Sequence, residues 1–180
     1  GKFEDYAGLF AGAGSFDIPE NYALGANLQL TPALSLAADY SRIKYSGVPA
    51  IGNPMSNLMS GNAMGSANGP GFGWSDVSVV KVGVQWQINA STVLRVGYNH
   101  STNPVKPENI TFNILAPGVI TKHYTLGGTY ALSKASELTW AYMYAPTNTV
   151  SGYSMYNGMM GLNPPSITET VRMSQQSLGI

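Results

Sequence analysis

Hydrophobic and polar side chains alternate one by one along seven segments of the chain. In residues 78–88, SVVKVGVQWQI, the even positions from 80 onward hold valine, tryptophan and isoleucine, whereas Lys81, Gln85 and Gln87 occupy odd positions. Because successive side chains of a strand point to opposite faces, this stretch predicts a strand with one apolar and one polar face. The same alternation predicts strands over residues 20–30, 34–45, 76–88, 92–101, 122–132, 137–146 and 169–180.

The connections between these segments are short and long in strict turn. Short connections at residues 31–33, 89–91 and 133–136 alternate with long ones at 46–75, 102–121 and 147–168. Outer-membrane barrels have this pattern, with tight turns on one side and long loops on the other. A soluble sandwich with Greek-key connections rarely keeps so regular an order. We therefore predict an all-β fold, an antiparallel up-and-down transmembrane β-barrel of which about seven strands are present.

The composition agrees with a barrel and disfavours several other classes. Charged residues are only 10% of the 180 residues, against roughly 25% in a typical soluble domain. Apolar residues are 44%, and no run approaches the roughly 18 apolar residues of a spanning helix. The formal net charge of zero argues against nucleic acid as a partner, and the lack of cysteine excludes disulfide and thiolate chemistry.

The polar positions of the predicted strands include ionisable side chains, namely Asp39, Lys81, Arg95 and His123. A dry protein core does not hold such groups unpaired, because each buried charge costs several kcal/mol. A water-filled lumen does, so we expect the polar face to line the lumen and the apolar face to meet lipid. Aromatic residues near the strand ends of the apolar face then form two interfacial girdles: Tyr22, Tyr40, Trp86, Tyr98, Tyr124, Tyr130, Tyr142 and Tyr144.

Four stretches resemble a known family of proteins. They are FDIPENYALG at 16–25, GPGFGWSDVSVVKVGVQW at 69–86, LRVGYNHSTNPV at 94–105 and HYTLGGTYAL at 123–132. In this order they are similar to the FadL/TodX family of outer-membrane transporters for long-chain fatty acids and aromatic hydrocarbons. The resemblance covers essentially the whole chain.

The resemblance implies a barrel of about fourteen strands with an N-terminal plug domain inside it. Residues 1–180 are then expected to be the C-terminal part of one barrel domain, without the plug and the first strands. The family's last strand usually ends in an aromatic residue that the barrel assembly machinery reads, whereas this chain reaches Ile180 without one. We expect the chain to be a piece of a larger barrel in the bacterial outer membrane, with membrane lipid as its surroundings.

The resemblance also implies passive uptake of long-chain fatty acids or other hydrophobic small molecules. In the family, the ligand enters an apolar groove between outer loops, passes into the barrel and leaves sideways through the wall. Methionine suits a surface that accepts varied apolar ligands. The expected groove residues are Leu9, Phe10, Phe16, Ile18, Met55, Leu58 and Met59. The alternative is that these side chains pack the loops onto one another as a cap.

The lumen residues also have two interpretations. Lys81 and Arg95 can receive a ligand carboxylate, or they can pair with Asp39, Glu137 or the plug domain. His123 can make pH-dependent contacts, or it can be one more polar group of the lumen.

Enzyme, metal and cofactor chemistry have little support in the sequence. No G-x-S-x-G elbow is present, and His100 and His123 are the only histidines. We expect neither enzymatic activity nor a cofactor. The remaining alternative to a hydrophobic-compound channel is a general porin or a structural barrel or adhesin. The apolar loops disfavour a porin, which needs a charged constriction.

Overall fold

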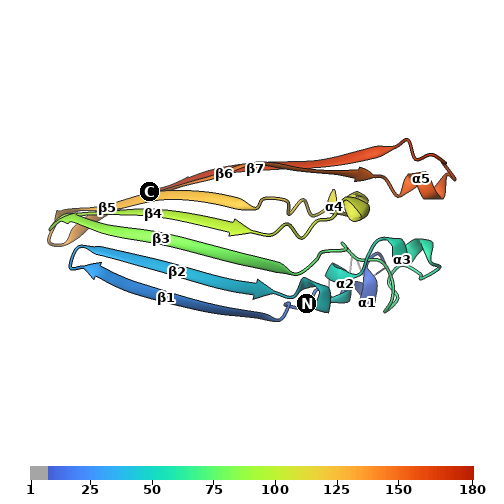
Figure 1. The fold of residues 1–180 in the computed structure, drawn as a ribbon, viewed down its shortest axis with the longest axis horizontal. Helices are drawn as coiled ribbons and strands as arrows, with labels where there is room; N and C mark the ends of the chain where they lie inside the picture. The colour runs from blue at the N-terminus through green and yellow to red at the C-terminus, as the bar shows by residue number, and fades with distance from the viewer. Residues whose placement is uncertain (1–7) are drawn as a thin grey trace.

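The computed structural model describes residues 8–180, so residues 1–7 of the first predicted outer segment lie outside it. Its seven strands form one antiparallel sheet in which each strand pairs with the next along the chain (Figure 1). They are β1 Asn21–Thr31, β2 Leu34–Ile43, β3 Val77–Asn89, β4 Thr92–Ser101, β5 Lys122–Ser133, β6 Ser136–Tyr153 and β7 Thr168–Gly179. The seven predicted strands and their up-and-down order are confirmed. Over the described residues the sheet stays open between β1 and β7, as part of a barrel wall.

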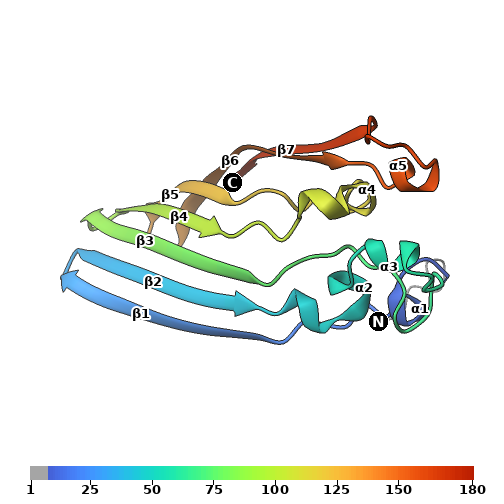
Figure 2. The same ribbon diagram turned by 45° about the vertical axis from the view of Figure 1, so that its right-hand side comes forward.

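The two ends of the sheet differ as the connection lengths predict. The tight hairpins all lie at one end, and every helix lies at the other (Figures 1 and 2). No helix within residues 8–180 is long and apolar enough to cross a membrane. The short helices are α1 Ala11–Gly14, α2 Pro49–Gly52, α3 Ser56–Met59, α4 Ile110–Asn113 and α5 Tyr156–Met159, with single 3-10 turns η2 Tyr45–Gly47 and η3 Pro107–Asn109.

The strand register places like side chains in rows across the sheet. On the polar face, Asp39 of β2 lies opposite Lys81 of β3. In the same row, Asn99 of β4 lies opposite Lys81 on one side and His123 of β5 on the other. On the apolar face, one row crosses all seven strands: Leu28, Leu36, Val84, Val96, Leu126, Tyr142 and Leu178. The two faces therefore differ over the whole sheet, as the alternation of the sequence predicts.

Strand β6 is longer than predicted. The sequence prediction ended it at residue 146, whereas it continues to Tyr153 in pairing with β7. One extra residue of β6 is inserted between Ala145 and Asn148, where Pro146 has no N–H to donate to the ladder. Such a bulge exchanges the two faces beyond it, so the alternation of the sequence breaks although the strand does not.

The outer half of β6 and β7 extends beyond the end of β5 and supports the loop at residues 102–121. The pairing of β5 with β6 ends at Tyr144. Beyond it, β7 contributes Val171 to a buried cluster with Val105, Ile110 and Val119 of that loop. Gly152 lies so close to the Pro107 carbonyl that a Cβ atom there would collide with the backbone. The β6–β7 hairpin therefore supports the loop at residues 102–121 by direct packing.

Candidate functional site

Residues 8–19, 44–76, 102–121 and 154–167, which we call the loop cap, pack together at the outer end of the sheet. Their buried cluster joins Phe10, Ala50, Met55, Phe72 and Phe112. The ring centroids of Phe10 and Phe72 are 4.5 Å apart, and Phe112 meets Phe10 edge to face at 5.8 Å. Aromatic rings in these arrangements stabilise contact beyond the area that they bury. The loop cap thus has a hydrophobic core of its own.

Two buried amides fasten the loops to one another. The indole N–H of Trp74 donates to Asn113 Oδ1 at 2.6 Å. Asn113 Nδ2 in turn donates to the carbonyls of Phe72 and Asn109, both at 2.8 Å. The backbone N–H of Met55 donates to Asn109 Oδ1 at 2.9 Å. Because the two asparagines are almost fully enclosed, these bonds have no solvent to replace them.

A carboxylate holds the start of the first long loop against strand β3. Asp76 Oδ1 accepts hydrogen bonds from the Ser46 hydroxyl at 2.7 Å and from the Ser46 backbone N–H at 3.1 Å. Arg42 lies 3.4 Å from the other carboxylate oxygen. The hydrogen bonds from Ser46, followed by the charge of Arg42, hold the pKa of Asp76 below its ordinary value.

Acidification is expected to loosen this junction. Because the pKa of Asp76 is lowered in the folded protein, its stabilisation is complete above the ordinary value of about 3.9 and is lost as the pH falls through the lower folded value. Pepsin should therefore cut the loop at residues 46–75 faster as the pH falls below about 4, beyond the change in pepsin's own activity. An Asp76→Asn variant should show no such additional acceleration; identical pH profiles for the two proteins would contradict the assignment.

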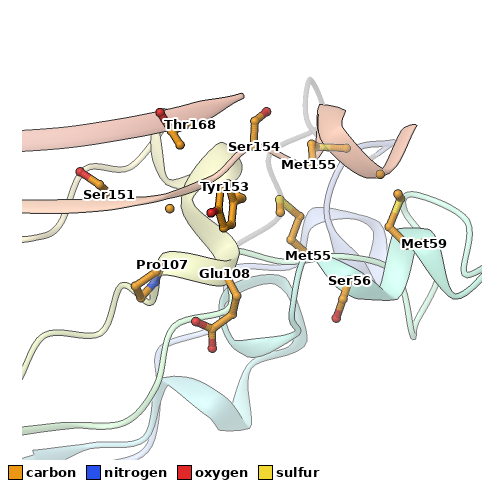
Figure 3. Close-up of a pocket in the computed structure, with 12 residues that line it drawn as sticks. Met55, Ser56, Met59, Pro107, Glu108, Ser151, Tyr153, Ser154, Met155 and Thr168 are labelled. Atoms are coloured by element: carbon orange, nitrogen blue, oxygen red, sulfur yellow. The ribbon is translucent and has the colours of Figure 1, made fainter. Parts of the chain in front are cut away.

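A cavity of about 680 Å³ opens between the loop cap and the outer end of β6. The long loop at 46–75 contributes Met55, Ser56 and Met59. In Figure 3 the Met55 side chain reaches toward Met155, with Tyr153 beside them. The remaining wall comes from η3 and from the two sides of the β6–β7 connection: Pro107, Glu108, Ser151, Gly152, Ser154, Gly158 and Thr168. Three thioethers, a phenol ring and a proline make most of this surface suitable for apolar ligands.

Two of the groove residues expected from the sequence, Met55 and Met59, lie in the wall of this cavity. Met55 is almost fully buried, whereas half of the Met59 surface is exposed at the rim. Met59 also packs over Gly158 of the last loop, whose missing side chain leaves room for it. These two side chains therefore connect the hydrophobic core of the loop cap with the cavity.

The other expected groove residues lie elsewhere. Phe10 is buried in the loop-cap core, and Leu9 and Phe16 pack against that core. Leu58 is half-buried outside the cavity wall. Ile18 is 89% exposed just before β1. Their role in a groove remains a prediction, because the described part of the chain places them away from this cavity.

Several wall residues lie outside the set of expected groove residues. Tyr153 and Met155 belong to the loop at 147–168, whose methionine and tyrosine residues already mark it in the sequence as an unusually apolar outer loop. Pro107 and Glu108 carry no such signal, because only the folding of their loop against Gly152 brings them to the cavity.

The predicted lumen residues share the polar face, but they form few bonds with one another. Asp39 and Lys81 lie opposite each other without an ion pair within residues 8–180. The Asp39 carboxylate instead lies over Gly25, which has no side chain to block it. Asn99 Oδ1 and His123 Nδ1 are enclosed without a hydrogen-bond partner among the described residues. This row therefore presents unused polar groups on one face of the wall.

Arg95, on the same polar face, is held in place by side-chain hydrogen bonds. Its Nε donates to Gln85 Oε1 at 2.9 Å, and its Nη1 donates to Thr129 Oγ1 at 2.8 Å. Thr129 continues the network to Thr139 across the next strand at 3.1 Å. Arg95 thus ties four neighbouring strands together on the polar face.

Comparison with solved structures finds the same fold in bacterial hydrocarbon channels. The toluene transporter TodX of Pseudomonas putida aligns with a TM-score of 0.58 at 17% identity, covering 92% of this chain and 34% of TodX. The toluene transporter TbuX of Ralstonia pickettii aligns with a TM-score of 0.50 at 18% identity, covering 91% of this chain and 33% of TbuX. The chain therefore spans about a third of the length of these proteins.

Comparison of sequences gives a family but no individual relative. No curated protein matches the chain. Residues 9–172 match the family described as outer membrane protein transport protein (OMPP1/FadL/TodX). This match includes six complete strands, the beginning of β7 and the described loop cap almost in full. The chain belongs to the OMPP1/FadL/TodX family of outer-membrane transport proteins.

Proposed function

We propose that this chain forms part of the wall and the outer cap of a channel for passive uptake of hydrophobic small molecules. The observation that carries the proposal is the cavity lined by Met55, Met59, Tyr153 and Met155 at the outer end of the sheet. An apolar cavity of several hundred Å³ with few polar groups is a typical small-molecule site. Its place among the long loops is where a ligand from outside would first meet the protein.

We further propose that residues 1–180 are the C-terminal part of a larger barrel, with the polar face toward its lumen. The open sheet edges at β1 and β7 support this, because a bilayer does not tolerate unpaired strand edges. The unused groups of Asp39, Lys81, Asn99 and His123 support it as well, since water or an internal domain can satisfy them. Outer-membrane lipid and the barrel assembly machinery are the partners expected for such a wall.

The proposed ligands range from long-chain fatty acids to small hydrocarbons. Long-chain fatty acids and small hydrocarbons both have the apolar surface that the cavity wall can cover. Two of the structures with the same fold are toluene transporters by name. A general porin is a weaker candidate, because methionine and aromatic side chains dominate the loop cap.

Uptake by cells provides the test. The complete protein would be produced in a Gram-negative host that lacks its own hydrophobic uptake channel, and entry of radiolabelled toluene and oleate would be measured. Met59→Asp is expected to lower uptake of the transported compound about tenfold, because a charge at the rim disfavours entry of an apolar molecule into the cavity.

Met64→Asp is the matched control. Met64 is 49% exposed and Met59 is 51% exposed, and both belong to the same loop, but Met64 does not line the cavity. Uptake that depends on the protein and falls with Met59→Asp but not with Met64→Asp supports the proposal. No protein-dependent uptake of either compound, or an equal loss in both variants, would overturn it.

A further inference from the structure

The charges around the cavity are distributed unevenly. Among residues 8–180, Glu108 is the only wall residue that is charged at neutral pH, and no lysine, arginine or histidine of this part of the chain lines the cavity. A second carboxylate, Glu169, lies behind the wall and accepts hydrogen bonds from Thr111 and Ser154. Ser154 is itself a wall residue. The charged groups that the described residues place at the apolar cavity are therefore both negative.

Two basic residues line a second, more polar cavity of about 600 Å³. Its wall includes Arg42 and Lys106, and it shares Glu108 and Ser56 with the apolar cavity. Arg42 is engaged with Asp76 and Ser78. In Figure 3 the Glu108 carboxylate and the Ser56 hydroxyl point away from the methionine side chains. Glu108 thus stands at the boundary between the apolar wall and the basic residues.

This arrangement has opposite consequences for two kinds of hydrophobic ligand. A fatty acid that places its chain along Met55 and Met155 brings its carboxylate toward Glu108, and like charges at short range repel even in water. Lys106 lines the second cavity together with Glu108, so a head group bound there stays close to the same carboxylate. An uncharged aromatic molecule meets no such repulsion, and its ring makes favourable contacts with thioether sulfur and with the Tyr153 ring.

We propose that Glu108 makes the cavity selective for uncharged hydrophobic molecules and against fatty-acid carboxylates. This inference rests on the proposed function of the same cavity as the capture site. Glu108 acts here as a specificity-determining residue, because its charge decides which ligands stay and its side chain adds little apolar contact.

Binding of toluene and laurate to the complete protein in lipid nanodiscs tests the inference. At pH 7.5, where laurate is ionised, Glu108→Gln is expected to tighten laurate binding about fivefold to tenfold by removing the repulsion. Toluene binding should change less than about twofold, because the toluene molecule has no charge for Glu108 to repel. Glu137→Gln, at the exposed far end of β6, serves as the control and should leave both affinities unchanged.

The outcomes separate this inference from the proposed function. Tighter laurate binding with unchanged toluene binding in Glu108→Gln supports it. If both probes bind and Glu108→Gln changes neither, the selectivity role fails while the capture site stands. If neither probe binds to the wild-type protein, both the selectivity role and the capture site fail.

Discussion

Replacing Leu126 with lysine is expected to prevent most of the protein from assembling in a membrane. Leu126 lies in the apolar row that crosses all seven strands, between Val96 and Tyr142, and it is 43% exposed on that face. If this face meets lipid, a lysine near the middle of the bilayer costs about 2–4 kcal/mol of folding free energy. The folded fraction in phospholipid vesicles can be measured by electrophoresis of unheated samples.

Thr125→Lys is the control for this experiment. Thr125 is the preceding residue of the same strand, so its side chain points to the polar face. The Thr125 side chain lies over Gly97, which has no side chain and so leaves room for the longer side chain of lysine. The ammonium group of a lysine at position 125 should reach water, so the substitution should change the folding free energy little. Equal losses at Thr125 and Leu126 would contradict the assignment of the polar face to the lumen.

Removing the Asn113 side chain is expected to release the loop cap while leaving the sheet folded. Asn113→Ala leaves the Trp74 indole N–H and the carbonyls of Phe72 and Asn109 without their partner in a buried setting. The cost of orphaned buried groups is about 2–3 kcal/mol. Hydrogen exchange should therefore accelerate at residues 46–75 and 102–121, with the strand amides unchanged.

Asn68→Ala provides a comparison within the same loop. Asn68 is exposed, and its backbone carbonyl, which accepts a bond from Asn57, is retained in the variant. In Asn68→Ala, hydrogen exchange of the loop cap should therefore stay at the wild-type rate. If Asn113→Ala also leaves the exchange rate of the loop cap unchanged, the buried amides do not fasten the loops.

The strands were predictable because their signal is local. The segments show the alternation of a sheet with two different faces, least clearly at residues 169–180, and the register then follows from the tight hairpins. The outer half of β6 was missed for a local reason too. The bulge at Pro146 exchanges the faces, so Val150 has the same parity as Tyr142 and Tyr144 but faces the other side of the sheet, and the alternation no longer marks one continuous strand.

The site was only partly predictable because it depends on contacts between distant segments. Met55 and Met59 stood out by residue type, since methionine is suited to apolar binding surfaces. Phe10 has an equally suggestive side chain, yet it fills the core of the loop cap. Glu108 has no local signal, because its position depends on the fit of η3 against Gly152 across more than forty residues of sequence.

Locating a ligand in the complete protein tests most directly whether the cavity is a capture site. Crystals soaked with 4-bromotoluene would be measured at the bromine absorption edge, where anomalous scattering marks the bromine position. A bromine peak is expected in the cavity between Met55, Tyr153 and Met155. A cavity filled by another segment of the protein, with bromine bound elsewhere or absent, would contradict the proposed capture site.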